Sequence, residues 1–241
     1  MSTHRRLFLT ALRFCARLPA AGFKGADAVQ PGAAARYVPI VGALIGAVGG
    51  AVYWLGAQLW PTSIAVVLSM LATAVLPGGT PANAVFEQPA SDTTGHVRVA
   101  GLNLAGYVFA LLLKYNTLMA LSAASLPFAV PANIALVLIM ICGHAASRAL
   151  VVSLIASSGQ ASPTRISNSD LVFALSAGFA PAALLGIPGL IGLAIAILAR
   201  VAFGAYLKRN RNTVANGAFY AMQQLTEVCF YLAALASWAF V

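Results

Sequence analysis

The sequence predicts an all-α protein, a polytopic membrane bundle of about seven transmembrane helices, preceded by an amphipathic surface helix with its N-terminus in the cytoplasm. Of its 241 residues, 61% are hydrophobic and 8% charged, whereas soluble domains carry roughly 25% charged residues. Seven apolar runs have the length that crosses a bilayer, and basic residues gather in alternate connections between them. We therefore expect one integral membrane domain, 1–241.

The first element is the amphipathic stretch LFLTALRFCARL, residues 7–18. Arg13 and Arg17 interrupt its apolar run, which is therefore too short for a secretory signal. We expect a helix that lies on the inner membrane surface, with its basic side chains toward anionic headgroups.

The seven spans follow in order. Ile187-Pro188-Gly189 is the expected fold-back within the long apolar stretch 170–207, and Pro61 and Pro131 occupy two other short turns. The runs are 38–58, 62–78, 101–126, 132–154, 170–187, 189–207 and 219–240.

The basic residues indicate the orientation. Eleven of the fourteen Lys and Arg residues fall in the segments 1–37, 79–100, 155–169 and 208–218, and none falls in the turns at 59–61, 127–131 and 188. The positive-inside rule places the basic segments in the cytoplasm, and we expect a multi-pass protein of the bacterial inner membrane. This topology accounts for the net charge of +9 without nucleic acid. The three cysteines show no zinc-site spacing.

Lys114, Arg148 and Arg200 lie within spans. Arg200 is close enough to the inner boundary to reach it, whereas a cation near mid-bilayer costs about 2.5–3.5 kcal/mol and normally faces a partner or a wet cavity. His144 and Arg148 are four residues apart and share a helical face, so they predict a phosphate-binding wall. A polar contact between helices is the alternative, and for Lys114 a contact with carbonyl groups.

The last span carries Gln223, Gln224 and Glu227 within two turns. A buried carboxylate needs a cation or a metal, and the candidate partners of Glu227 are Arg148, Arg98 and a bound Mg²⁺. The polar loop 76–98 is the other candidate for chemistry, because it holds Glu87, Asp92, His96 and Arg98.

Five segments, taken in order, resemble the cobalamin synthases, which are adenosylcobinamide-GDP ribazoletransferases. They are ALRFCARLP (11–19), ARYVPIVGALIGAV (35–48), LLLKY (111–115), GHAASR (143–148) and AMQQLTEVCFYL (221–232). The resemblance implies a transferase that joins adenosylcobinamide-GDP to α-ribazole or its 5′-phosphate and releases GMP. The lipid bilayer and other enzymes of cobalamin assembly are candidate partners, and the chain alone leaves oligomerisation open.

The resemblance also implies site residues. The catalytic candidates are Arg98, His144 and Arg148; the substrate-binding candidates are Arg17, Arg36, Lys114, Gln223 and Gln224; the Mg²⁺ candidates are Glu87, Asp92 and Glu227. Substitution at phosphorus needs groups that neutralise the diphosphate and position the nucleophile, and Mg²⁺ serves this purpose in many enzymes.

This chain departs from the family pattern where an acidic run is expected. Pro77, Gly78 and Gly79 occupy the place of a His and the first acids, and Asn83 that of a later Asp. His96 and Gly217 each replace a further Asp. Two alternatives to an active transferase therefore remain: a catalytically silent relative that binds a corrinoid or an assembly partner, and a transporter that uses Lys114, Arg148 and Glu227.

Overall fold

The structure is a computed structural model that describes residues 3–15, 31–76, 96–123, 131–157, 166–209 and 217–238. No β-strand occurs in these ranges, which confirms the predicted all-α class. The helices are α1 (Thr3–Cys15), α2 (Pro31–Ala34), the 3₁₀ turn η2 (Ala35–Tyr37), α3 (Val38–Leu59), α4 (Thr62–Val75), α6 (His96–Ala123), α7 (Ala132–Ser157), α8 (Asn168–Leu184), α9 (Ile187–Arg209) and α10 (Gly217–Trp238).

Each of the seven predicted spans overlaps one of the helices α3, α4, α6, α7, α8, α9 and α10. Among the described residues, three helical stretches are long and apolar enough to cross a membrane: Gly32–Leu59, Ala132–Ser157 and Ile187–Arg209. They indicate a membrane protein. The number of membrane crossings stays a prediction. Helix α4 is apolar but short, and whether a helix crosses the membrane depends on bilayer thickness as well as on helix length.

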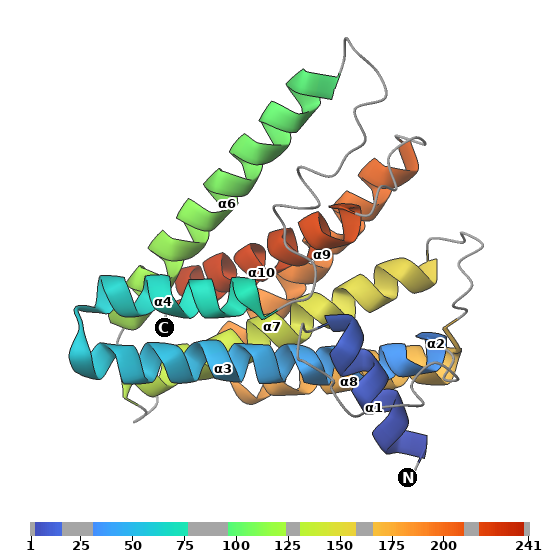
Figure 1. Ribbon diagram of the computed structural model, residues 1–241, viewed down its shortest axis with the longest axis horizontal. Coiled ribbons are helices and arrows are strands. Elements are labelled where there is room, and N and C mark those ends of the chain that lie inside the picture. Colours follow the sequence, from blue (N-terminus) through green and yellow to red (C-terminus); the bar gives the residue numbers. More distant parts are fainter. Residues whose placement is uncertain are drawn as a thin grey trace.

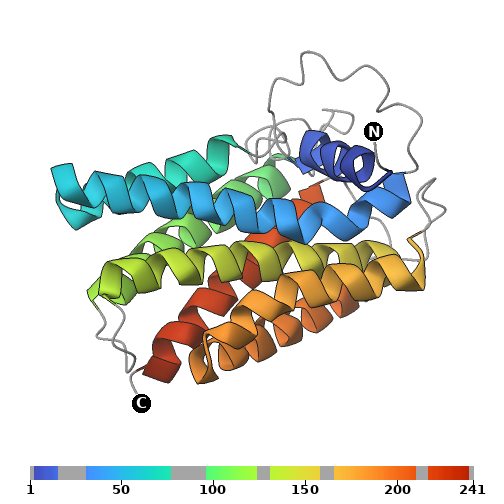
Figure 2. The same cartoon turned by 90° about the horizontal axis from the view of Figure 1, so that it is seen from below.

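Successive helices run back and forth between two ends of the bundle (Figures 1 and 2). The α3–α4 turn and the C-terminal end of α10 lie at one end, whereas α1, α2 and the C-terminal end of α9 lie at the other. The basic side chains of α1, Arg36, Lys208 and Arg209 belong to this second end. These basic residues, from which the sequence predicts the orientation, therefore lie at one end of the folded bundle. The side of the membrane that this end faces stays a prediction.

Helix α7 is the central element of the bundle. It contacts α3, α6, α8, α9 and α10, and all side chains from Cys142 to Leu150 are buried. Helix α3 approaches α7 closely along a glycine ridge, here defined as Gly42, Gly46 and Gly50. A Cβ atom at Gly46 would lie 2.7 Å from the Met140 carbonyl oxygen, and one at Gly50 2.7 Å from Val137 Cγ1. Small residues at four-residue spacing permit such backbone contact between apolar helices.

The fold-back between α8 and α9 lies at Leu185–Gly186, two residues before the predicted position. Gly186 has φ 68°, and its amide N–H donates to the Ala183 carbonyl at 3.1 Å. A left-handed glycine of this kind ends many helices. The predicted fold-back at Ile187-Pro188-Gly189 is therefore two residues too late. Pro188 is the second residue of α9, where no intrahelical N–H bond is lost.

Helix α1 is amphipathic, as predicted. Leu7 and Ala11 are buried against Ala34, Val41 and Ile45, while the residues from Thr3 to Arg6 and Arg13 are exposed. Its polar face includes Arg5, Arg6 and Arg13. Contact of this face with lipid headgroups stays a prediction.

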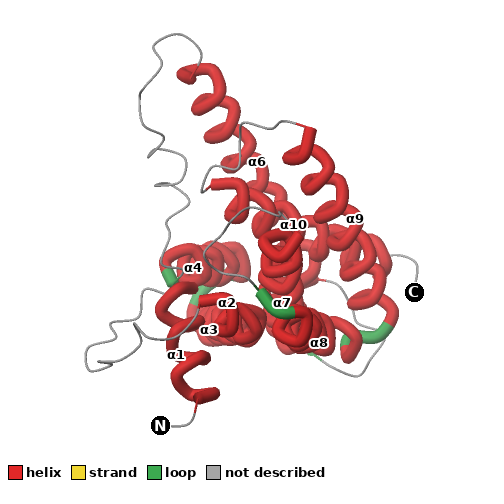
Figure 3. Tube along the Cα trace, turned by 90° about the vertical axis from the view of Figure 1, so that its right-hand side faces the viewer, coloured by secondary structure: helices red, strands yellow, loops and turns green. Residues whose placement is uncertain are grey.

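Helix α6 departs from the bundle toward its N-terminal end. Figures 1 and 3 show it inclined away from α3 and α4, and the side chains of Val108 and Phe109 are exposed. A Cβ atom added at Gly106 would meet nothing within 4 Å among the described residues. The second half of α6 returns to the bundle, since Lys114, Leu118 and Leu121 are buried.

Candidate functional site

Four ionisable side chains from three helices meet inside the bundle. Lys114 of α6, His144 and Arg148 of α7 and Glu227 of α10 are exposed by 4%, 2%, 3% and 0% respectively. The name central cluster is used below for these four residues. The first and the last of them, Lys114 and Glu227, are 113 residues apart along the chain, so only the packing of the helices brings the cluster together.

Glu227 is the hub of the central cluster. Its Oε1 atom lies 2.6 Å from Lys114 Nζ and 3.3 Å from His144 Nε2. The Tyr231 hydroxyl, one turn further along α10, donates to the same oxygen at 3.0 Å. The predicted partners of Glu227 were Arg148, Arg98 and Mg²⁺; the structure corrects this, because its direct ionic partner is Lys114. Lys114 thus has a carboxylate as its partner, and the alternative of a contact with carbonyl groups stays a prediction.

Arg148 determines the proton arrangement on His144. Arg148 Nη1 lies 3.1 Å from His144 Nδ1 and donates to the His144 carbonyl oxygen at 3.2 Å. Because a guanidinium only donates hydrogen bonds, Nδ1 is the acceptor, and a neutral ring carries its proton on Nε2, toward Glu227. The predicted shared face of His144 and Arg148 is therefore a direct contact within one helical turn.

The charges of the central cluster do not cancel. Lys114 and Arg148 are cations, whereas Glu227 is the single carboxylate, and it lies against Lys114. No carboxylate of the described residues lies within ion-pair distance of Arg148. A buried guanidinium without a counter-charge is costly and attracts an anion with two parallel acceptor oxygens. The cluster is therefore suited to phosphate.

A small hollow opens beside the central cluster, between α4, α6, α7 and α10. Lys114 and His144 contribute to its lining, together with Tyr107, Tyr220, Gln223 and Gln224. The two predicted glutamines thus lie at the same hollow as the cluster. Gln224 Nε2 donates to the Tyr220 hydroxyl at 3.4 Å, whereas the Gln223 carboxamide forms no side-chain hydrogen bond with the described residues.

The other predicted cations are engaged elsewhere. Arg36 Nε lies 2.9 Å from Asp170 Oδ1 at the start of α8, so this residue joins η2 to α8. Arg200, within α9, donates to the Ser153 carbonyl at 2.8 Å and to the Ser157 hydroxyl at 2.6 Å. Both residues hold helices together in this arrangement and neither contacts the central cluster.

The backbone of Arg98 is described, whereas the position of its side chain stays a prediction. The residue lies in the first turn of α6, sixteen residues before Lys114, which is about 24 Å along the helix axis at 1.5 Å per residue. Arg17, Glu87 and Asp92 lie outside the described residues.

Sequence reasoning did not identify Tyr231, Tyr220 or Tyr107 as site residues. The spacing held a signal for the first two, since Tyr231 follows Glu227 by four residues and Tyr220 precedes Gln224 by four. Residues at this spacing are neighbours on a helix surface. No such signal existed for Tyr107, because its relation to Tyr220 depends on how α6 packs beside α10.

The described residues do not fit a divalent metal site. No group of three or more His, Cys, Asp or Glu side chains converges among them, whereas Mg²⁺ prefers several oxygen ligands. Glu227 is already neutralised by Lys114 at 2.6 Å, and Arg148 adds further positive charge nearby. Burial raises the pKa of the Cys15 thiol to about 11, so this thiol stays protonated near neutral pH.

The fold and site define a class: a helical membrane protein with a buried, net cationic centre. A model of the cobalamin-5-phosphate synthase family matches residues 7–82. The chain is 34% identical to an adenosylcobinamide-GDP ribazoletransferase of Leptothrix cholodnii over 96% of this chain and 95% of that protein. The corresponding enzymes of Ralstonia pickettii and Shewanella frigidimarina are 29% and 28% identical, again over more than nine-tenths of both chains.

The chain belongs to the adenosylcobinamide-GDP ribazoletransferase family. No solved structure matches it.

Proposed function

We propose that this protein is a transferase of cobalamin biosynthesis that joins adenosylcobinamide-GDP to α-ribazole or its 5′-phosphate. A ribose hydroxyl oxygen forms a bond to the phosphorus that carries the cobinamide, and the bond from that phosphorus to the oxygen of GMP breaks. GMP leaves with the electron pair, and the hydroxyl proton passes to solvent. Family membership over nearly the full chain supports this reaction.

The central cluster supports the role of phosphate binding. Arg148 carries the uncompensated positive charge, and its planar guanidinium matches two oxygens of a phosphate. Lys114 adds charge beside it while it remains paired with Glu227. Fixed cations that face the charge developing on phosphoryl oxygens stabilise the transition state. Arg148 is therefore the residue we assign to the diphosphate.

Glu227 and the glutamines support the positioning of the other substrate. Glu227 Oε2 is a buried acceptor without a hydrogen-bond partner among the described residues. Such an atom costs free energy until a donor reaches it, and a substrate hydroxyl is a donor of the required kind. The Gln223 carboxamide, which is free at the hollow, can bind a second polar group of the same ligand.

The chemistry of Mg²⁺, where it is bound, would be neutralisation of the diphosphate and activation of the leaving group. Because the described residues do not form a site for it, we assign no step to the metal. The role of the predicted ligands Glu87 and Asp92 stays a prediction.

The basic end of the bundle supports a location in the inner membrane with this end in the cytoplasm. The positive-inside rule relates such a charge asymmetry to orientation. In that orientation the diphosphate approaches from the cytoplasm, where the other enzymes of cobalamin assembly are the expected partners.

The direct test is GMP release by the purified protein in detergent with adenosylcobinamide-GDP, α-ribazole and Mg²⁺. We expect release by the wild type and a loss of about 100-fold in kcat/KM for Arg148→Ala, the scale for removal of one donor to a developing oxyanion. The matched control is Arg200→Ala, since Arg200 is also a helix-embedded arginine but binds Ser153 and Ser157. Equal losses in the two variants would contradict the phosphate role of Arg148.

A catalytically silent, corrinoid-binding relative is the second candidate function. The commitment of Glu227 to Lys114 favours it, because the cluster then offers no free carboxylate for a metal. Corrinoid binding without any GMP release by the wild type would establish this alternative.

A further inference from the structure

The hollow beside the central cluster has a composition that the phosphate role does not explain. Its outer part is formed by Tyr107 of α6 and by Tyr220, Gln223 and Gln224 of α10. All four side chains are partly exposed, whereas Lys114 and His144 at the same hollow are buried. Two phenol rings and two carboxamides carry no positive charge that would neutralise a phosphate. Their chemistry suits a flat, polar heterocycle.

We propose that this outer part of the hollow binds the planar base of a nucleoside, with Tyr107 and Tyr220 against the ring faces and Gln223 bonded to the ring edge. Aromatic side chains bind bases by stacking, and a carboxamide carries both a donor and an acceptor. The Gln223 amide has no side-chain partner among the described residues. It is therefore available for the edge of a base.

The position of the hollow relative to the central cluster fits a nucleoside. Tyr220 precedes Glu227 by seven residues on α10, about 10 Å along the helix axis. A ligand in this hollow has a flat aromatic end at the tyrosines and a polar end at Lys114 and His144, the two residues of the central cluster that line it. A nucleoside or nucleotide has this form, with the ribose between the two ends.

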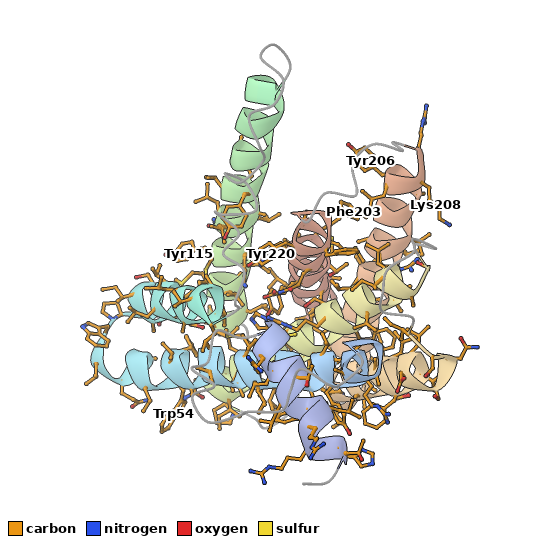
Figure 4. The ribbon with its side chains drawn as sticks, turned by 45° about the vertical axis from the view of Figure 1, so that its right-hand side comes forward. Trp54, Tyr115, Phe203, Tyr206, Lys208 and Tyr220 are labelled. Carbon is orange, nitrogen blue, oxygen red and sulfur yellow. The ribbon has the colours of Figure 1, made fainter. Side chains whose placement is uncertain are left out.

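Helix α6 forms one wall of the hollow through Tyr107, Leu111 and Lys114. The side chains of Ala105, Val108 and Phe109 are exposed, and α6 inclines away from the other helices at this end (Figure 1). In Figure 4, Tyr220 lies on α10 toward α6, whereas Tyr206 lies at the far end of α9. The hollow encloses about 10 Å³ in this structure, so a base binds there only when α6 moves away from α10, while the closely packed α3–α7 pair can stay in place.

The inference rests on the proposed function, because the reaction supplies two nucleosides with flat bases. One is α-ribazole, with a benzimidazole base, and the other is the guanosine of the leaving GMP. Both have the chemistry that the tyrosines and glutamines recognise, and binding measurements separate them.

The experiment measures equilibrium binding of α-ribazole and of GMP, each alone, to the purified protein by calorimetry. The variants are Tyr107→Ala, Tyr220→Ala and Tyr220→Phe. Tyr206→Ala is the matched control, since Tyr206 is an exposed tyrosine of α9. We expect each alanine variant at Tyr107 or Tyr220 to bind one of the two nucleosides about tenfold more weakly. Tyr220→Phe and Tyr206→Ala should keep wild-type affinity for both.

A second measurement needs no variant. Hydrogen exchange of the wild-type protein should slow in residues 217–224 and 105–111 when the bound nucleoside is present, and should not change in α8. This arm holds even if an alanine variant does not fold.

Two results would overturn the inference: wild-type affinity for both nucleosides in Tyr107→Ala and Tyr220→Ala, or no binding of either nucleoside by the wild type. The transferase is tested separately. Tyrosine-dependent nucleoside binding without GMP release would refute the transferase and keep the base site. GMP release with unchanged kinetics in both alanine variants would refute the base site and keep the transferase.

Discussion

The two groups of charged residues in this protein differ in their surroundings. In the central cluster, Lys114 and Glu227 meet at 2.6 Å with side chains exposed by 5% and 0%. At the basic end of the bundle, Arg36 and Asp170 meet at 2.9 Å with side chains exposed by 27% and 10%. The two ion-pair distances are similar, so the two groups differ in how far their side chains are exposed to solvent.

That difference separates the roles of the two groups. Asp170 is also bound by Ser167, whose hydroxyl donates to Asp170 Oδ2 at 2.6 Å and accepts from the Asp170 amide at 3.1 Å. This reciprocal bonding is that of a helix N-cap, and Arg36 adds to it a link to η2. The Arg36–Asp170 pair is complete within itself, whereas the central cluster keeps an uncompensated cation. A balanced pair stabilises a helix end, and an unbalanced buried group is suited to a charged ligand.

The largest effect is expected from removal of the Glu227 carboxylate. Glu227→Ala leaves Lys114 buried without its counter-charge, and breaking a buried pair in this way costs about 3–5 kcal/mol. We expect a large loss of stability in thermal unfolding of the detergent-solubilised protein. The double variant Lys114→Met with Glu227→Gln removes both charges and should recover much of it. Equal stabilities of the single and double variants would show that the pair is not buried as described.

An intermediate effect is expected at Gly42. A Cβ atom there would lie 2.5 Å from the His144 carbonyl oxygen and 2.7 Å from Arg148 Cδ. Gly42→Ala should destabilise the protein by about 1–3 kcal/mol, as overpacking does, and should also displace Arg148. Gly46→Ala is the matched control, because its Cβ atom would meet Met140 instead.

The measurement at Gly42 is kcat/KM for GMP release beside the unfolding temperature. Both glycine variants should lose stability, but only Gly42→Ala should lose kcat/KM more than the loss of folded protein explains. Equal kcat/KM values for the two variants would show that packing at Gly42 does not position Arg148.

The smallest effect is expected from Asp170→Asn, which removes the ion pair with Arg36 and keeps a side chain able to bond Ser167. Pairs of this kind near a surface contribute at most about 1 kcal/mol. The difference in unfolding free energy between the wild type and Asp170→Asn should decrease at about 1 M salt, where the screening length is about 3 Å. Unfolding of both proteins at low and high salt measures this, and GMP release should stay unchanged. A loss of activity as large as that of Arg148→Ala would place Asp170 in the site.

The fold was largely predictable because hydrophobic length is a local property. All seven predicted spans coincide with helices within a few residues. The α8–α9 turn was displaced because Pro188 serves as a helix start in this protein, and a proline near a turn fits either a helix end or a helix start. The sequence letters did not separate these two uses.

The candidate site was only partly predictable. The contact between His144 and Arg148 follows from their four-residue spacing, and the sequence therefore contained it. The pairing of Lys114 with Glu227 depends on how α6 and α10 are rotated about their axes. That rotation is set by packing against α7, which no local spacing encodes.

The placement of Glu227 on the last helix has a consequence for biogenesis. Synthesis delivers Lys114 and Arg148 to the membrane first, and the acid that neutralises Lys114 follows more than a hundred residues later. A nascent chain that stops before α10 therefore holds the Lys114 ammonium group between apolar helices without its counter-charge. The charge of Lys114 is therefore neutralised only when translation is complete. Chains that end before α10 should be preferred targets of membrane proteases.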